Sequence, residues 1–125
     1  MPTRLILVRH GQTQWNRVER FRGRADIALD TVGIGQAQSI AASTFYRNVA
    51  AVYSSPLKRA IQTAQPTADW LKQEVHHLQG VTDVDYGDWQ GLTVKQAEKR
   101  DPGIFAQWRY IPQSTRFPQG ESLEE

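Results

Sequence analysis

The chain has 125 residues, a length that suits one domain with one hydrophobic core, and 39% of its residues are apolar. Its formal net charge of +2 is too small to indicate a nucleic-acid partner, and the absence of cysteine excludes disulfides, thiolate metal ligands and a cysteine nucleophile. The first apolar run, residues 5–8, is too short for a signal peptide or a membrane span. We therefore expect a soluble, cytoplasmic protein that binds neither nucleic acid nor a membrane.

The first predicted element is a buried strand over residues 5–8, and Arg9, His10 and Gly11 follow it directly. In an open α/β sheet, ligands bind beyond the carboxyl ends of the strands, so a guanidinium and an imidazole there indicate an anion site. Arginine is also concentrated before residue 25, where the one acidic residue is Glu19. The arginines of this segment are Arg4, Arg9, Arg17, Arg20, Arg22 and Arg24. Their charge alone fits a solvated basic face and an anion site equally well.

The next segments alternate helical and extended patterns, which favours βαβ units and a mostly parallel sheet. Residues 11–30 form a long polar loop of the kind that often carries function. Apolar residues at helical spacing then predict a helix over residues 31–46. Gly33 and Gly35 weaken its start by about 1 kcal/mol each relative to alanine. Some contact other than helix propensity must hold that end.

A second strand is predicted over residues 49–53, and residues 54–56 then supply a helix cap followed by proline at the first helical position. The helix that follows would carry Arg59 in its first turn. We expect it to kink or break just before Pro66, because proline lacks the N–H that a helix interior needs. A third extended segment is predicted over residues 74–78.

The last third of the chain begins with a capping box at residues 93–96, which predicts a short helix that residues 101–103 would close. Residues 104–119 look irregular. Within them we expect Trp108 and Phe117 to anchor the segment by packing rather than to bind a ligand.

The histidine at the end of the first predicted strand can act as a nucleophile toward phosphorus, because imidazole is nucleophilic near neutral pH and the N–P bond is labile. Attack by His10 on a phosphate dianion needs neighbouring cations. Arg9 is adjacent in sequence, and Arg59 lies at a helix start, where phosphate also binds well. The leaving alkoxide needs a proton, and the loop from Asp83 to Asp88 is the clustered source of acids. This scheme needs no metal and no other cofactor, because arginine neutralises the phosphate.

These residues lie in longer segments that resemble the histidine phosphatases, the group that includes phosphoglycerate mutase. The matching segments are Leu7 to Thr13 with Trp15 and Asn16, Gly23 with Asp26 and Leu29, Gly33 with Gln36 and Ala37, Tyr53 to Leu57, Arg59 to Ala64, Asp83 to Thr93, and Pro118 to Ser122. They stand in the family's order and span nearly the whole chain. The resemblance implies one domain over residues 1–125 with a three-layer α/β/α fold around a mostly parallel sheet.

The resemblance also implies roles for single residues. His10 would be the phosphorylated nucleophile, and Arg9 and Arg59 would bind the phosphate of the substrate. Asn16 occupies a position that contacts the transferring phosphoryl group in relatives. The expected ligand is a small phosphorylated metabolite.

The segments that would border the substrate carry the remaining candidates. Gly23 lies in a loop beside the substrate, with Arg22 next to it as a further candidate contact. Asp83 stands where many members carry the glutamate that donates a proton, and aspartate keeps the carboxyl on a side chain one methylene shorter. Asp85 and Asp88 are the alternative proton donors.

The chain departs from the family at its end. Family members carry a second catalytic histidine in a Ser-His-Gly well past the segment that matches residues 120–122, whereas this sequence stops at Glu125. We expect the remaining histidines, His76 and His77, to be strand or surface residues. Two explanations are open: the domain is truncated, which we favour, or a second copy of the chain covers the exposed sheet edge. Either way, the isolated chain should be impaired in activity and prone to associate.

Three functions are consistent with this sequence. The leading hypothesis is a phosphatase that hydrolyses small phosphorylated metabolites through phospho-His10. The second is a mutase, which returns the phosphoryl group to the product, although mutase relatives carry longer elaborations around the cleft. The third is a catalytically impaired module that binds phosphorylated ligands, which the missing second histidine favours. The sequence does not identify the substrate.

Overall fold

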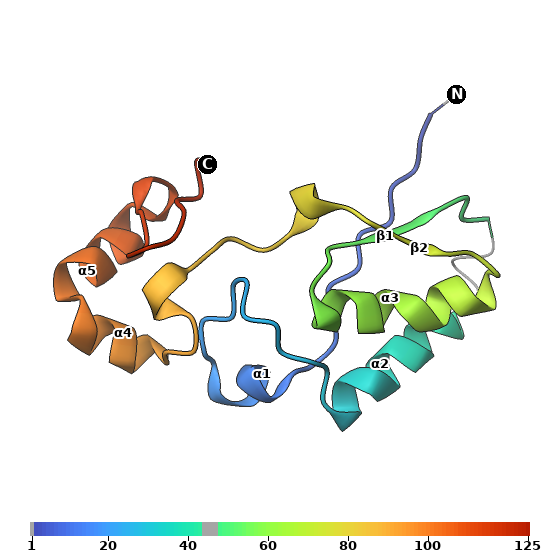
Figure 1. Cartoon of the computed structure of the whole chain (residues 1–125), viewed down its shortest axis with the longest axis horizontal. Helices are drawn as coiled ribbons and strands as arrows, with labels where there is room; N and C mark the ends of the chain where they lie inside the picture. Colours follow the sequence, from blue (N-terminus) through green and yellow to red (C-terminus); the bar gives the residue numbers. More distant parts are fainter. Residues whose placement is uncertain (1, 44–47) are drawn as a thin grey trace.

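The computed structural model describes residues 2–43 and 48–125. In chain order its helices and strands are α1 (Gln14–Val18), α2 (Thr31–Ala41), β1 (Val52–Ser54), α3 (Lys58–Trp70), β2 (Val75–His77), α4 (Val94–Arg100) and α5 (Pro102–Tyr110). Short 3-10 turns lie at Gln79–Val81, Gly87–Trp89 and Pro112–Ser114. The strands, α2 and α3 form one end of the molecule, and α4 and α5 form the other (Figure 1).

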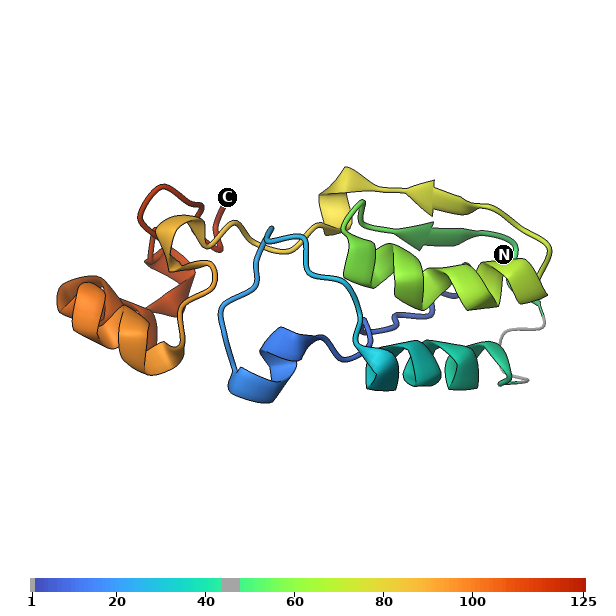
Figure 2. The same ribbon diagram turned by 60° about the horizontal axis from the view of Figure 1, so that its bottom comes forward.

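The strands β1 and β2 pair in parallel, with Tyr53 opposite His76, and α3 is the crossover between them. The helix α3 lies along one face of the strands and packs on its other side against α2 (Figure 2). Parallel strands joined through a helix are the βαβ unit that the alternating pattern predicts. The α/β prediction is therefore confirmed, and β2 falls within the predicted third extended segment.

The strand predicted over residues 5–8 is wrong, because this segment is neither helix nor strand in the structure. Leu5 and Leu7 are 80% and 92% exposed. A strand needs a hydrogen-bonded neighbour, and within the described residues the sheet consists of β1 and β2. Residues 5–8 are therefore apolar enough to be buried, but the described residues do not bury them. Coverage by a second copy stays a prediction.

The start of α2 is held by side-chain and backbone contacts from the preceding loop. Asp30 caps the helix by accepting a hydrogen bond from the backbone N–H of Gly33 at 2.8 Å, and Gln12 donates to the same carboxylate at 2.8 Å. A Cβ on Gly33 would lie 2.2 Å from the carbonyl oxygen of Gln12, and one on Gly11 would lie 2.7 Å from the carbonyl oxygen of Gly33. Glycine at position 33 lowers the helix propensity of α2, but its missing side chain allows the backbone of residues 11–12 to approach closely. The helix ends at Ala41, earlier than predicted, and residues 44–46 of the predicted helix lie outside the described residues.

The helix α3 differs from its prediction at two points. It begins at Lys58 rather than at Pro56, and its first N–H donates to Asp26 of the preceding loop at 2.7 Å. The prediction at Pro66 was a kink or a break, and the break is wrong because the helix continues through Pro66 to Trp70. Buried residues on both sides of the proline, including Thr63 and Ala68, keep the two halves packed as one helix.

An aromatic cluster forms the hydrophobic core at the other end of the molecule. Its buried members are Phe21, Trp89, Ala97, Phe105 and Phe117, and the half-buried Tyr86 and Trp108 pack against them. The rings meet mostly at steep angles, with centroids 4.8 to 6.3 Å apart, as aromatic quadrupoles favour. The prediction that Trp108 and Phe117 anchor this region by packing is confirmed.

The helix α5 was not expected, because residues 101–103 were interpreted as a helix end. The capping box at Thr93 and Gln96 does open α4 as predicted. Asp101 then ends α4 and also precedes Pro102 as the cap of α5, since proline is well tolerated at the first helical position. The indole N–H of Trp89 donates to the Asp101 carboxylate at 2.8 Å, which fixes this corner to the aromatic cluster.

The two glycines of α2 differ in the space around them, so replacing each with alanine tests the close approach at the start of the helix. Gly33→Ala should destabilise the fold by about 1–3 kcal/mol or more, because the new methyl would overlap the Gln12 backbone. Gly35→Ala should be neutral or stabilise by about 0.5–1 kcal/mol, because nothing lies within 4 Å of its Cβ position. Urea unfolding measures both free energies, and equal effects of the two substitutions would contradict the close approach.

Candidate active site

The buried guanidinium of Arg59, in the first turn of α3, bonds two loops that are distant in the sequence. Its side chain is 2% exposed, and it donates to the carbonyl oxygens of Gly23 at 2.6 Å and Ala25 at 2.9 Å. It also donates to the Asp83 carboxylate at 3.3 Å. Burial lowers the pKa of Arg59 below its ordinary value, and the neighbouring Asp83 charge opposes that shift. The loop of residues 22–26 is thus fixed to the start of α3.

His10 is oriented by its own neighbour in the chain. Its Nδ1 lies 2.7 Å from the carbonyl oxygen of Gly11. A carbonyl can only accept, so Nδ1 carries the proton and Nε2 keeps its lone pair. Burial lowers the pKa of His10 from 6.5, and the positive charges of Arg59, Arg22 and Arg9 lower it further, while the bond to Gly11 acts in the other direction. The imidazole is therefore neutral near pH 7, as a nucleophile must be.

Thr63 links the segment of His10 and Gly11 to α3, a connection that sequence reasoning missed. Its hydroxyl accepts a hydrogen bond from the backbone N–H of Gly11 at 2.9 Å and donates to the carbonyl of Arg59 at 2.7 Å. Thr63 stands one turn after Arg59 and is 5% exposed. A polar residue four positions after a site arginine was the available signal, because both project from the same helix face.

The structure separates the three acidic candidates. Asp83 is the one that reaches the site, through its bond to Arg59. The carboxylate of Asp85 accepts from the backbone N–H of Gly87 at 2.8 Å, and Asp88 pairs with Arg100 at 3.3 Å. The Asp83 side chain is also 41% exposed, so its carboxylate is accessible from solvent. Of the three candidates, Asp83 is therefore the one in contact with Arg59.

Asn16 completes the capping box at the start of α1. Its Oδ1 accepts from the backbone N–H of Thr13 at 2.8 Å and from the Thr13 hydroxyl at 3.1 Å. This cap uses the amide oxygen, so Nδ2 keeps its two N–H donors for an anion.

Gly23 lies where the loop of residues 22–26 meets the segment after Asp83. Its φ of +52° favours glycine, and a Cβ there would lie 2.7 Å from the carbonyl oxygen of Val84 and 2.8 Å from the Tyr86 ring. Arg22 precedes it with a buried Nε that has no hydrogen-bond partner among the described residues. Sequence reasoning placed both residues at the edge of the site. In the structure the carbonyl of Gly23 accepts from Arg59, and the charge of Arg22 lowers the pKa of Arg59 and of His10.

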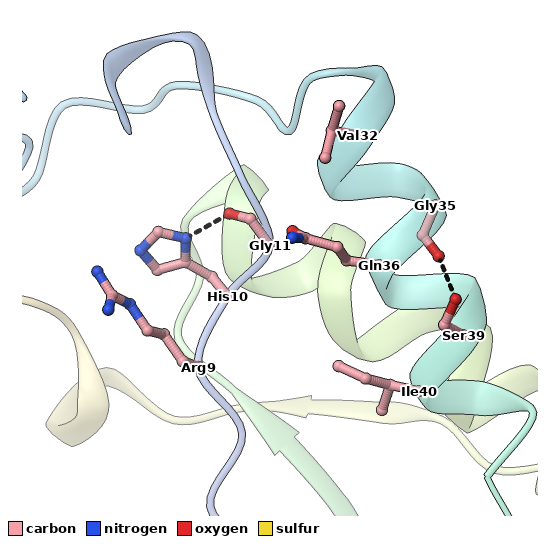
Figure 3. Close-up of a pocket in the computed structure, with 8 residues that line it drawn as sticks. All are labelled: Arg9, His10, Gly11, Val32, Gly35, Gln36, Ser39 and Ile40. Atoms are coloured by element: carbon pink, nitrogen blue, oxygen red, sulfur yellow. Dashed lines mark hydrogen bonds between the residues drawn. The ribbon is translucent and has the colours of Figure 1, made fainter. Parts of the chain in front are cut away.

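Arg9 and His10 line a hollow of about 670 Å³ between their segment and α2 (Figure 3). Its other lining residues are Gly11, Val32, Gly35, Gln36, Ser39 and Ile40. Figure 3 shows the side chains of Arg9 and His10 together on one side of the chain, with Gln36 extending from α2 toward Gly11. Arg9 is exposed, and none of the ion pairs of the described residues includes it.

The other two histidines lie on β2, as predicted. Both are exposed, and the His76 ring packs at 5.3 Å against Tyr53 of the neighbouring strand. In the part of the chain that the structure describes, no group of three or more histidine, aspartate or glutamate residues is placed to hold a metal ion. No described helix is both long and apolar enough to cross a membrane.

The family model of the histidine phosphatase superfamily (branch 1) matches residues 5–125. The chain belongs to this superfamily. Phosphoserine phosphatase 1 of Hydrogenobacter thermophilus is 36% identical over 96% of the chain and 57% of its own length. The bifunctional protein Rv2228c of Mycobacterium tuberculosis is 39% identical over 99% of the chain and 34% of its own length.

Solved structures agree with this assignment. The α-ribazole phosphatase of Shigella flexneri superposes with a TM-score of 0.84 at 28% identity, covering 94% of this chain and 58% of that one. The predicted phosphoglycerate mutase-like fold is confirmed. The chain spans between 34% and 60% of the length of the curated relatives it matches.

The lowered pKa of His10 can be measured by following its ring resonances by NMR across pH. Because folding lowers this pKa, the unfolded chain takes up the proton first as pH falls, so acidification through and below 6.5 works against folding. We expect a titration midpoint below 6.5 and an upward shift in Arg22→Gln, which removes one nearby positive charge. A midpoint at or above 6.5 would contradict the burial of this imidazole among arginines.

Proposed function

We propose that this chain hydrolyses small phosphorylated metabolites through a phosphohistidine at His10. The observation that carries the proposal is the orientation of the imidazole, whose Nδ1 is held by Gly11. Its free Nε2 lies in the field of three arginines, Arg59, Arg22 and Arg9. A neutral nucleophile among fixed cations is what attack on a phosphate dianion requires.

The reaction would proceed in two displacements. In the first, Nε2 of His10 forms a bond to phosphorus while the bond from phosphorus to the ester oxygen breaks, and protonated Asp83 gives its proton to the leaving alkoxide. In the second, water attacks the phosphoryl group, Asp83 takes a proton from that water, and the N–P bond breaks. Inorganic phosphate leaves, and both His10 and Asp83 return to their starting protonation states.

The remaining residues would bind the phosphoryl group. Arg9 and Arg59 would pair with its oxygens, and α3, which begins beside Arg59, presents its positive end. Asn16 would donate through Nδ2, and Gly23 would allow the substrate to approach the backbone. Because Arg59 also bonds Asp83 in this structure, a bound phosphate would compete for Arg59 and release the carboxyl toward the leaving group.

A binding module without turnover is the second candidate. The observation that favours it is the position of His76 and His77 on β2, where His76 packs against Tyr53 rather than against His10. Such a module would retain the phosphate contacts of Arg9 and Arg59 and lack efficient hydrolysis.

Phosphate release from p-nitrophenyl phosphate and from a panel of alkyl phosphates, with chelator present, tests the proposal. His10→Ala should abolish release. Asp83→Asn should slow the alkyl phosphates by about 100- to 10,000-fold and p-nitrophenyl phosphate much less, because p-nitrophenolate is a weak base that leaves without a proton. Asp88→Asn is the matched control and should remain close to the unmodified chain, since its carboxylate pairs with Arg100.

The outcomes separate the candidate functions. Equal release by the unmodified chain and His10→Ala would overturn hydrolysis through His10. Tight phosphate binding without release would favour the binding module. Migration of phosphate to a second hydroxyl of the substrate, with little release, would indicate a mutase.

A further inference from the structure

The two peptide units on either side of Gly11 are held by two different helices. The N–H of Gly11 donates to the Thr63 hydroxyl of α3 at 2.9 Å, and the N–H of Gln12 donates to Oε1 of Gln36 on α2 at 2.9 Å. Thr63 thus holds the peptide unit before Gly11, and Gln36 holds the peptide unit after it. Glycine has no Cβ to restrict either unit, so their orientations depend on such contacts.

The peptide unit between Gly11 and Gln12 also orients the imidazole of His10. Its carbonyl, that of Gly11, lies 2.7 Å from Nδ1 of His10. A trans peptide unit is planar, and its N–H and C=O point in opposite directions. When Gln36 accepts from the N–H on one side, the carbonyl is therefore directed to the other side, toward His10. Gln36 acts on the imidazole through this rigid unit and not by touching it.

The position of Gln36 on α2 makes this contact possible. It stands three residues after Gly33, whose missing side chain lets the Gln12 backbone approach the helix. Residues three apart share a helix face, so the close approach and the side-chain amide meet the same stretch of backbone. Figure 3 shows the Gln36 side chain extending from α2 toward Gly11. Because Gln36 is exposed, its replacement should leave the packing of α2 intact.

The orientation of this carbonyl decides which ring nitrogen of His10 carries the proton. In a neutral imidazole, the hydrogen bond made by one nitrogen sets the state of the other. The Gly11 carbonyl keeps the proton on Nδ1 and leaves Nε2 with a lone pair. Rotation of the peptide unit would remove this acceptor and allow the proton to move to Nε2, where it would block attack on phosphorus.

We propose that Gln36 is a positioning residue for His10. By accepting from the N–H of Gln12, it keeps the Gly11 carbonyl on Nδ1 and the Nε2 atom unprotonated. The effect of Gln36 on turnover rests on the hydrolysis proposed above, whereas its effect on the position of the proton does not.

NMR of the ring nitrogens, in the unliganded chain with isotope-labelled histidine, distinguishes the two proton positions at alkaline pH, where the ring is neutral. Gln36→Met keeps the length of the side chain and removes the acceptor. The ratio of the Nδ1–H form to the Nε2–H form of His10 should then fall about 3- to 10-fold, as expected for the loss of one neutral hydrogen bond. Gln36→Glu keeps an oxygen there and should hold the ratio within about twofold of the unmodified chain.

Gln38→Met is the matched control, because it makes the same change at an exposed position of the same helix and should leave the ratio unchanged. His10→Ala lacks the signals of this ring and so identifies them. Phosphate release from p-nitrophenyl phosphate gives a second readout. Under the proposed hydrolysis, Gln36→Met should lower kcat and change KM less than about twofold, because the contact acts on the nucleophile and not on the bound phosphate.

The outcomes separate this inference from the proposed function. An unchanged ratio in Gln36→Met, or an equal fall in Gln36→Glu or Gln38→Met, would overturn the role of Gln36. A rise in KM with an unchanged ratio would place Gln36 on the phosphoryl group and overturn it as well. A ratio that falls in Gln36→Met alone, in a chain that releases no phosphate, would refute the hydrolysis and leave the role of Gln36 standing.

Discussion

The buried guanidinium of Arg59 is the interaction on which the rest of the site depends. A charge that is 2% exposed is stable only if fixed acceptors replace its water, and the chain supplies them from Gly23, Ala25 and Asp83. These acceptors come from two loops that are distant in sequence from α3. Satisfying one charge therefore brings together the segments that would border a substrate.

The site combines fixed parts with free ones. Thr63 and Gly11 hold His10 at a set place relative to Arg59, and the close approach of Gly11 to Gly33 fixes the same segment to α2. Arg9 and Arg22, by contrast, are in no ion pair among the described residues. A fixed imidazole beside these two arginines favours binding of an anion, because little reorganisation is needed when the anion arrives.

The sequence could propose His10, Arg59 and Asp83 as site residues because the type and position of each side chain suggest a chemical role. The structure adds that Arg59 bonds Asp83 and that Gly11 orients His10. The apolar pattern of residues 5–8 was not enough to predict a strand. Such a pattern indicates a segment suited to burial, but it does not show whether a neighbouring strand is present to pair with it. The helix α5 was missed because Pro102 was interpreted as a helix end, whereas it opens a new helix. The continuous α3 was missed because Pro66 was expected to interrupt it, whereas packing on both sides of the proline keeps the helix whole. Thr63 was missed because its role depends on a partner 52 positions away.

Detection of a phosphoryl group on His10 tests the proposed nucleophile directly. The chain is mixed with a phosphate monoester, quenched in base, where phosphohistidine survives, and digested for mass spectrometry. We predict one added phosphoryl group on the peptide that contains His10, and none in His10→Ala. Phosphate release without that modification, or the phosphoryl group on His76 or His77, would contradict the assignment of His10 as the nucleophile.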